Sequence, residues 1–135
     1  MIATIEQQAG KFYAFIHSGD FEGLLRTCSE NIQWTVYGPQ TIPYAGVYQG
    51  VNGVREFVRL LLDSEEISEF MPDEFIVDEA KGVVCVLGHE TSIAKSTGKK
   101  FSAKWSQILR FESDQLVSFE EYIDTYALSD AYTSS

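Results

Sequence analysis

The chain has 135 residues, of which 44% are hydrophobic, and this length and composition fit one globular domain and exclude a disordered chain. Ten Lys and Arg against 20 Asp and Glu give a formal net charge of −10, which disfavours nucleic acids and anionic membrane surfaces as partners. No apolar run approaches the roughly 18 residues of a membrane span. The N-terminal residues lack the features of a secretory signal, so we expect a cytoplasmic protein.

The two cysteines, Cys28 and Cys85, lie far apart in the sequence and no pattern joins them. This favours two free thiols in a reducing compartment over a disulfide. The sequence also lacks the common metal- and nucleotide-binding motifs, and its two histidines are too few for a histidine-rich metal site. We therefore expect no metal and no cofactor.

The first half of the chain has mainly the apolar periodicity of helices. The expected elements are helices over residues 3–18, 21–28 and 53–64, and a half-buried strand over 31–37. Gly19 is expected to end the first helix, and Asp20 and Asn52 to cap the next two. Residues 38–50 contain prolines and glycines typical of a shaped loop. The acidic run over residues 63–69 is interpreted as a solvated helix end and loop.

The second half changes to a period of two, which is typical of strands joined by tight turns. The expected strands cover residues 74–78, 83–95, 100–112 and 116–125. Helices followed by an antiparallel meander predict an α+β fold, in which the sheet curls over the helices and leaves a pocket between them. We expect one domain over residues 1–130 and a frayed tail over 131–135, with Asp124 capping a turn near the end.

The length of each hairpin turn determines which residues of two neighbouring strands lie opposite each other, and so which side chains share a face. A turn at residues 96–99 places Glu90 opposite Trp105, and the next turn places Gln107 opposite Glu121. The face that carries these side chains is otherwise almost entirely apolar. We therefore expect it to be the inward face of the curved sheet.

Two carboxylates on this face are the most informative feature of the sequence. Burying a carboxylate without a partner costs several kcal/mol or raises its pKa, and either outcome suits acid–base chemistry near neutral pH. Glu90 and Glu121 are thus candidate catalytic residues. The alternative is that they lie in water at the rim, or that they pair with Lys104 or Arg110.

Several other side chains have two possible interpretations. Trp34 and Trp105 are expected to flank the pocket, either as filling of the core or as a platform for a flat apolar ligand. Tyr48 either hangs into the pocket mouth or packs within its loop. Gln107 either orients a substrate carbonyl or satisfies the carboxylate of Glu121.

Five short motifs follow one another along the chain: Ser18-Gly-Asp-Phe21, Trp34-Thr-Val-Tyr-Gly-Pro39, Ile42-Pro-Tyr-Ala-Gly-Val-Tyr-Gln-Gly50, Gly53-Val-Arg-Glu-Phe57 and Phe119-Glu-Glu-Tyr-Ile-Asp-Thr-Tyr126. With the order of the elements, they resemble the nuclear-transport-factor-type fold in its SnoaL-like branch, within the ketosteroid isomerase-like superfamily. The resemblance covers nearly the whole chain. It implies a cone-shaped curved sheet wrapped around a pocket, and a homodimer formed through the outer face of the sheet.

The resemblance can be followed residue by residue to two reactions. The aspartate base of ketosteroid isomerases falls on Val36, their tyrosine on Phe12, next to Tyr13, and their protonated aspartate on Gln107. None of these three is kept, so the resemblance does not imply steroid isomerisation by that set of residues.

Limonene-type epoxide hydrolases are a closer match. Their two pocket aspartates fall on Glu90 and Glu121, each one methylene longer. The arginine that bridges these acids falls on Gly88, and the asparagine that positions water falls on Val36, so both are absent. SnoaL-type cyclases use a pocket acid as a proton shuttle, a role that the resemblance implies for either glutamate.

The sequence therefore predicts a SnoaL-like enzyme of the isomerase, cyclase or hydrolase type, in which Glu90 and Glu121 act as acid and base on a mainly apolar organic molecule. The alternatives are a non-catalytic carrier of a small apolar metabolite and a dimerisation scaffold with a filled core. Buried carboxylates in a closed pocket favour the enzyme, whereas carboxylates at a rim or in salt bridges favour the carrier. The expected ligand-binding residues are Phe12, Trp34, Val36, Tyr48, Phe57, Trp105 and Gln107.

Overall fold

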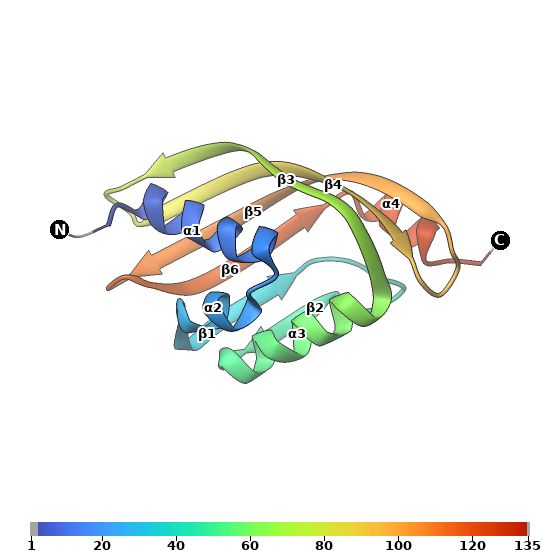
Figure 1. Cartoon of the computed structure of the whole chain (residues 1–135), viewed down its shortest axis with the longest axis horizontal. Coiled ribbons are helices and arrows are strands. Elements are labelled where there is room, and N and C mark those ends of the chain that lie inside the picture. The colour runs from blue at the N-terminus through green and yellow to red at the C-terminus, as the bar shows by residue number, and fades with distance from the viewer. Residues whose placement is uncertain (1–2, 135) are drawn as a thin grey trace.

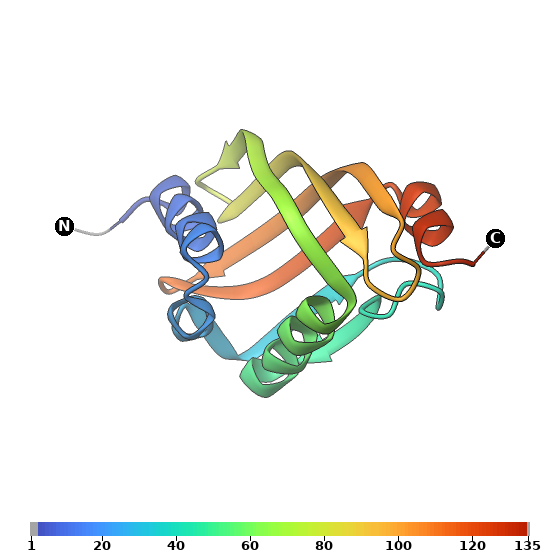
Figure 2. The same cartoon turned by 45° about the vertical axis from the view of Figure 1, so that its right-hand side comes forward.

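The computed structural model describes residues 3–134, and in it three helices lie against one face of a curved sheet (Figure 1). The fourth helix packs beside β5 at the far end of the sheet (Figure 2). The elements are α1 (Ile5–Ser18), α2 (Phe21–Arg26), β1 (Cys28–Val36), β2 (Gly46–Gln49), α3 (Gly50–Ser64), β3 (Glu65–Asp78), β4 (Val83–Ala94), β5 (Lys100–Glu112), β6 (Gln115–Ile123) and α4 (Thr125–Ala131).

The sheet has six strands in the order β2-β1-β6-β5-β4-β3, and it stays open, with β2 and β3 at its edges. All neighbouring pairs are antiparallel except β1 and β6, which are parallel. The predicted α+β fold with a curved, mostly antiparallel sheet is therefore confirmed. Among residues 3–134, no helix combines the length and the hydropathy that a membrane span requires.

Two of the predicted helix starts are confirmed by their caps. The side chain of Asp20 accepts a hydrogen bond from the backbone N–H of Gly23 at 2.9 Å, and Asp124 accepts one from Ala127 at 3.1 Å. Gly19 ends α1 with a φ of +74°, a left-handed conformation that glycine adopts without strain. The turns around α2 and α4 are thus set by local hydrogen bonding.

Other predicted boundaries are wrong. Helix α3 begins at Gly50 rather than after Asn52, and its N-cap, Gln49, makes no side-chain capping bond. Strand β1 begins at Cys28, before the predicted start at residue 31. The predicted loop over residues 38–50 contains strand β2, which is short enough to be hidden among the glycines and prolines.

The largest difference concerns β3. This strand runs over Glu65–Asp78, so residues 65–69 of the acidic run, interpreted as a solvated loop, belong to a long edge strand, whereas residues 63–64 are the predicted helix end. Register shifts between Ile67 and Glu69 and between Pro72 and Glu74 interrupt its alternation. These two irregularities and the many charged side chains remove the period-two signal on which the prediction of a strand depends.

The predicted registers are half right. Gln107 lies opposite Glu121, as predicted. Glu90 lies opposite Ala103 rather than Trp105, because Ile93 pairs with Lys100 and the turn between β4 and β5 is longer than expected. The shift is two residues, an even number, so Glu90 stays on the predicted face.

The ends of the chain and the cysteines complete the description. The expected tail begins inside α4, where Ala131 is buried and accepts a hydrogen bond from the Thr97 hydroxyl. Residues 1–2 of the expected domain and residue 135 of the expected tail lie outside the described residues. Cys28 is buried, Cys85 is half-buried, and both are free thiols.

A close contact between β4 and β5 requires glycine at position 88. A Cβ atom at Gly88 would lie 2.2 Å from the ring of Trp105 and 2.4 Å from the carbonyl oxygen of Met71. The second of these atoms belongs to the backbone of β3, which cannot move aside freely. The indole of Trp105 therefore lies directly on the backbone of its cross-strand partner.

We predict that Gly88→Ala lowers the free energy of unfolding by about 1–3 kcal/mol, because an extra methyl group overpacks this contact. The measurement is urea denaturation followed by circular dichroism. The control is Gly10→Ala in α1, where nothing lies within 4 Å of an added Cβ and alanine favours the helix by roughly 0.5–1 kcal/mol. Equal midpoints for Gly88→Ala and the unmodified protein would contradict the prediction.

Candidate functional site

A cavity of about 570 Å³ lies between the helices and the inner face of the sheet. Its size is typical of small-molecule sites. Side chains from α1, α2, α3 and from strands β1, β3, β4, β5 and β6 line it, and most of them are apolar. Its exposed lining residues, which mark the mouth, include His17, Ser18 and Gly19 at the end of α1, Leu62 in α3 and Glu69 in β3.

The inner wall of the cavity carries the polar residues that the sequence predicts. Glu90 from β4, Gln107 from β5 and Glu121 from β6 all line it. Glu90 is 4% exposed and Glu121 is 7% exposed, so both carboxyl groups are buried. The structure thus brings both predicted glutamates to one cavity.

Glu121 belongs to a chain of hydrogen bonds that begins on α1. The hydroxyl of Tyr13 donates to Oε1 of Gln107 at 2.6 Å, and Nε2 of Gln107 donates to Oε1 of Glu121 at 2.6 Å. Because a charged carboxylate can only accept hydrogen bonds, the amide nitrogen of Gln107 points to Glu121 and its amide oxygen points to Tyr13. Gln107 therefore satisfies Glu121 from a position on the cavity wall, and Tyr13 holds Gln107.

Glu90 has only one hydrogen bond among the described residues, from the hydroxyl of Ser92 to Oε2 at 3.0 Å. The salt bridges of residues 3–134 involve other side chains, on the molecular surface. Lys104 and Arg110, considered above as partners of the glutamates, are exposed on strand β5. Neither glutamate is therefore neutralised by a cation in the part of the chain that the structure describes.

Sequence reasoning missed a third buried carboxyl group. Glu65, the first residue of β3, is 2% exposed and accepts a hydrogen bond from the hydroxyl of Tyr44 through Oε1, whereas its Oε2 has no partner in residues 3–134. It lies near enough to Glu90 and Glu121 to raise the pKa of both. Glu65 sits in a run of acidic residues beside a register shift, so no alternation marked it as inward-facing.

Burial is the main reason why these carboxyl groups have unusual pKa values. It raises the pKa of Glu90 to about 9, and the neighbouring charges of Glu65 and Glu121 add to the effect. It raises the pKa of Glu121 to about 7, although the hydrogen bond from Gln107 favours the charged form. The pKa of Glu65 is raised by burial as well. At neutral pH the cavity therefore holds a protonated Glu90 beside a Glu121 that titrates.

The predicted ligand-binding residues divide into two groups. Phe12, Trp34, Phe57 and Gln107 line the cavity. Other lining residues that the prediction did not include are Tyr44, from the loop before β2, and Phe70 and Phe119, from β3 and β6.

The other three predicted residues lie outside the cavity lining. Val36 is buried at the end of β1, beside Glu121 in the sheet. Trp105 stacks on Tyr13 with ring centroids 6.1 Å apart, as part of the packed wall. The side chain of Tyr48 follows the second of its two interpretations.

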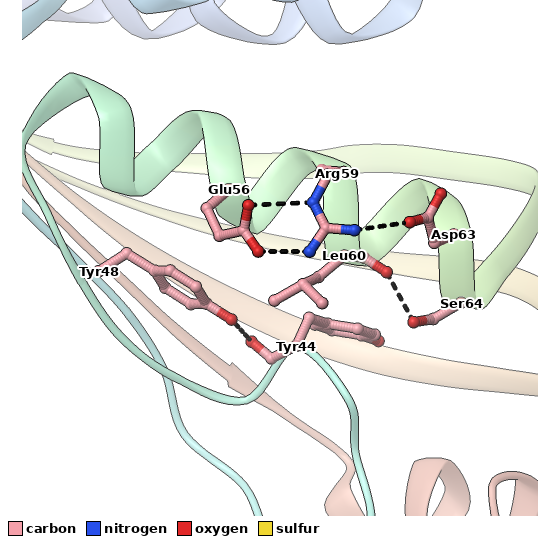
Figure 3. A network of polar contacts seen from close by, with 7 residues as sticks. All are labelled: Tyr44, Tyr48, Glu56, Arg59, Leu60, Asp63 and Ser64. Carbon is pink, nitrogen blue, oxygen red and sulfur yellow. Dashed lines mark hydrogen bonds and ion pairs between the residues drawn. The ribbon is translucent and has the colours of Figure 1, made fainter.

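Tyr48 packs within its own segment. Its hydroxyl donates to the carbonyl oxygen of Tyr44 at 2.8 Å, next to the ion pairs of Arg59 with Glu56 and Asp63 on α3 (Figure 3).

The position that the bridging arginine of epoxide hydrolases would take is Gly88, and Trp105 occupies the space that a side chain there would need. The exclusion of a side chain at Gly88 therefore follows from packing between strands.

Comparisons with known proteins agree on the fold. The sequence pattern of the SnoaL-like domain matches residues 9–119. An NTF2-like protein from Burkholderia xenovorans is 30% identical, with a TM-score of 0.86, and the alignment covers 98% of this chain and 100% of that one. An NTF2-like protein of unknown function from Burkholderia pseudomallei is 28% identical, with a TM-score of 0.82 and the same coverage.

A more distant structure contains a ligand. TerC, co-crystallized with polyporic acid, is 19% identical, with a TM-score of 0.83, and the alignment covers 98% of this chain and 100% of TerC. No curated protein matches the sequence.

We predict that Glu90→Gln stabilises the protein at neutral pH and not in acid. Below the ordinary pKa of 4.5 both the folded and the unfolded protein hold the proton, so burial of Glu90 has no ionisation cost. Between pH 4.5 and about 9 the unfolded protein loses this proton and the folded protein keeps it, so stability falls as pH rises. The variant lacks this loss, and we expect a gain of about 3 kcal/mol at pH 7 and almost none at pH 4.

Urea denaturation at a series of pH values measures this difference. The control is Glu66→Gln, which removes the same formal charge from an exposed position on β3. A gain for Glu90→Gln that is equal at pH 4 and pH 7, or no larger than that of the control, would count against a buried, protonated Glu90.

Proposed function

We propose that this chain, which belongs to the SnoaL-like domain family, is a small-molecule enzyme that moves a proton within a mainly apolar organic substrate. The observation that carries the proposal is the pair of buried carboxyl groups, Glu90 and Glu121, on one wall of an apolar cavity. Their pKa values, about 9 and about 7, suit one acid and one base at neutral pH.

The two glutamates have different roles in this proposal. Glu121, in its charged form, removes a proton from a carbon next to a substrate carbonyl, and Glu90 gives its proton to the carbonyl oxygen, which produces an enol. In a substrate whose carbon–carbon double bond lies one carbon further along, this enol is a dienol. Glu121 then returns its proton to the far end of the dienol while Glu90 takes back the hydroxyl proton, which shifts the double bond and restores both residues. Gln107 is a positioning residue, because its hydrogen bond holds Glu121 at the cavity wall.

The remainder of the cavity supports an apolar substrate. Trp34, Phe57 and Phe119 present aromatic rings to it, and the ring centroids of Trp34 and Phe119 are 3.8 Å apart. Aromatic surfaces of this kind bind flat organic molecules. The co-crystallisation of TerC with polyporic acid supports the choice of an organic ligand for a protein of this fold.

A non-catalytic carrier is the alternative function. A carrier has no need of unpaired carboxyl groups, whose burial costs several kcal/mol when they are charged. In the described residues, Glu90 and Glu121 are buried and in no salt bridge, which favours the enzyme.

We further propose that the chain forms a homodimer through the outer face of its sheet. This face exposes large apolar side chains from four strands, which bury favourably against a second copy. They are Val47 of β2, Ile76 of β3, Leu87 of β4 and Tyr122 of β6.

Deuterium exchange into 2-tetralone tests the proton transfer, because this flat ketone has acidic hydrogens next to its carbonyl group. We expect the protein in D₂O to catalyse exchange, with a rate that rises with pH through about 7 and falls above about 9. Glu121→Gln should lower the rate at least about 100-fold, because it removes the base. Proton NMR of the ketone measures the exchange.

Glu66→Gln is again the control and should exchange at the rate of the unmodified protein. Equal rates for Glu121→Gln and the unmodified protein would overturn the proposed role of Glu121. Saturable binding of 2-tetralone without any exchange would favour the carrier.

We predict that Leu87→Lys, on the outer face, converts the dimer to a monomer, because it places a charge in the apolar contact. Sedimentation-velocity ultracentrifugation measures the mass in solution. Leu62→Lys makes the same change at an exposed leucine of α3 and should leave the dimer intact. A monomeric unmodified protein, or a dimer that survives Leu87→Lys, would contradict the proposed interface.

A further inference from the structure

The charge of the cavity limits the kind of molecule that it can bind. Its lining contains Glu90, Glu121 and, at the mouth, Glu69, but neither lysine nor arginine among the described residues. Glu65 lies behind the wall and interacts with both inner glutamates. His17, at the mouth, is the one lining side chain of residues 3–134 that can become cationic, and it is exposed.

Each inner glutamate also has an oxygen atom that the protein leaves free. The hydrogen bond from Ser92 uses Oε2 of Glu90, and the one from Gln107 uses Oε1 of Glu121. Oε1 of Glu90 and Oε2 of Glu121 have no hydrogen-bond partner in residues 3–134, and neither is among the fully enclosed polar atoms. A carboxyl oxygen that reaches the cavity can interact with a positively charged or N–H-bearing group of a ligand.

Aromatic side chains make up much of the rest of the lining. They are Trp34, Tyr44, Phe57, Phe70 and Phe119. Aromatic rings attract cations, most strongly where water is excluded. Phe70 is the cross-strand partner of Glu90, and Phe119 lies two residues before Glu121 on β6, so a positively charged group in the cavity meets carboxyl oxygens and aromatic rings together.

We propose that the substrate of this cavity is a lipophilic cation, that is, a mainly apolar molecule with one protonated or quaternary nitrogen. This inference rests on the proposed function and names its substrate class. A carboxylate-bearing ligand is disfavoured, because no cation in the described lining opposes its charge and the glutamates repel it. The cationic nitrogen serves binding in this proposal, and the proton that Glu121 removes still lies next to the carbonyl group of the substrate.

The cation should change the ionisation of the cavity. A positive charge beside the cluster favours its charged form, so binding of the cation and loss of a proton by a glutamate assist each other. The groups that face the cluster are Tyr13 from α1, Tyr44 from the loop before β2, Glu65 from β3 and Tyr132 after α4, with His17 and Glu69, which pairs with His89, at the mouth. Because deprotonation leaves more negative charge in the cavity, affinity for a permanent cation should rise with pH.

Three naphthalene compounds of similar size test the proposal: trimethyl(2-naphthylmethyl)ammonium, neutral 2-naphthylmethanol and anionic 2-naphthylacetate. Isothermal titration calorimetry of the full chain at pH 8 measures their affinities. We expect the ammonium compound to bind at least about 10-fold more tightly than the alcohol, and the acid to bind most weakly. Between pH 6 and pH 9 the affinity for the ammonium compound should rise, with protons released to the buffer. This compound has no titratable proton, so the change reports on the protein.

The double variant Glu90→Gln, Glu121→Gln should bind the ammonium compound and the alcohol equally, because it removes the two carboxyl groups from the cavity and keeps the aromatic lining residues. Glu66→Gln has the same fold and one charge fewer outside the cavity, and it should keep the full preference. Thermal unfolding of both variants verifies that they are folded.

Equal or tighter binding of the alcohol or the acid overturns the proposal, and so does the absence of binding of the ammonium compound at about 1 mM. A preference that survives in the double variant overturns it as well, because the charge of the whole molecule would then be its cause. The proposed proton transfer is judged separately by exchange into 2-tetralone, which is neutral. Exchange that depends on Glu121, without a preference for the cation, would support the proposed enzyme and overturn only the proposed substrate class.

Discussion

In the part of the chain that the structure describes, three carboxyl groups lie buried on the inner side of the sheet without a cation beside them, and this constraint governs the chemistry of the molecule. A charged carboxylate in such a place is costly, so the group takes up a proton instead. Glu65, Glu90 and Glu121 interact with one another, and each makes the charged state of the others less favourable. The packed core has to offset this cost, because stable proteins retain only a small excess of favourable free energy.

The pairing of neighbouring strands places these carboxyl groups together. Strands β4, β5 and β6 are neighbours in one sheet, so side chains of equal parity gather on one face. Gln107 and Glu121 are direct cross-strand partners, which explains their hydrogen bond. Helix α1 adds Tyr13 from the other side of the core. The carboxyl group that acts as the base in our proposal is therefore held by two rigid elements.

Membership in the SnoaL-like domain family explains the fold and leaves the reaction open, since one fold hosts many functions. The residues that define two known reactions of this fold are absent here. Val36 and Phe12 are apolar, and at Gly88 the indole of Trp105 fills the space of any side chain. The cavity therefore has the acids without their usual positive partner. This difference makes a cationic substrate a reasonable complement to the site.

The sequence by itself determined the helices of the first half, the caps at Asp20 and Asp124, and the inward face of the meander. These features depend on short-range periodicity and local hydrogen bonds. The predicted register at Glu90 is wrong by two residues, but the predicted face is correct, because side chains of a strand repeat their direction every second residue.

Only the tertiary structure decided which residues complete the site. Glu65 faces inward because it pairs with Ala94, an inward position of β4, and the two register shifts farther along β3 interrupt the alternation that would mark it in the sequence. Trp34 lines the cavity and Trp105 does not, because Tyr13 of α1 and Phe70 of β3 stack on the indole of Trp105. The absence of a cation beside the glutamates, within residues 3–134, is likewise decided by the whole fold, because no element contributes a lysine or arginine to the cavity lining.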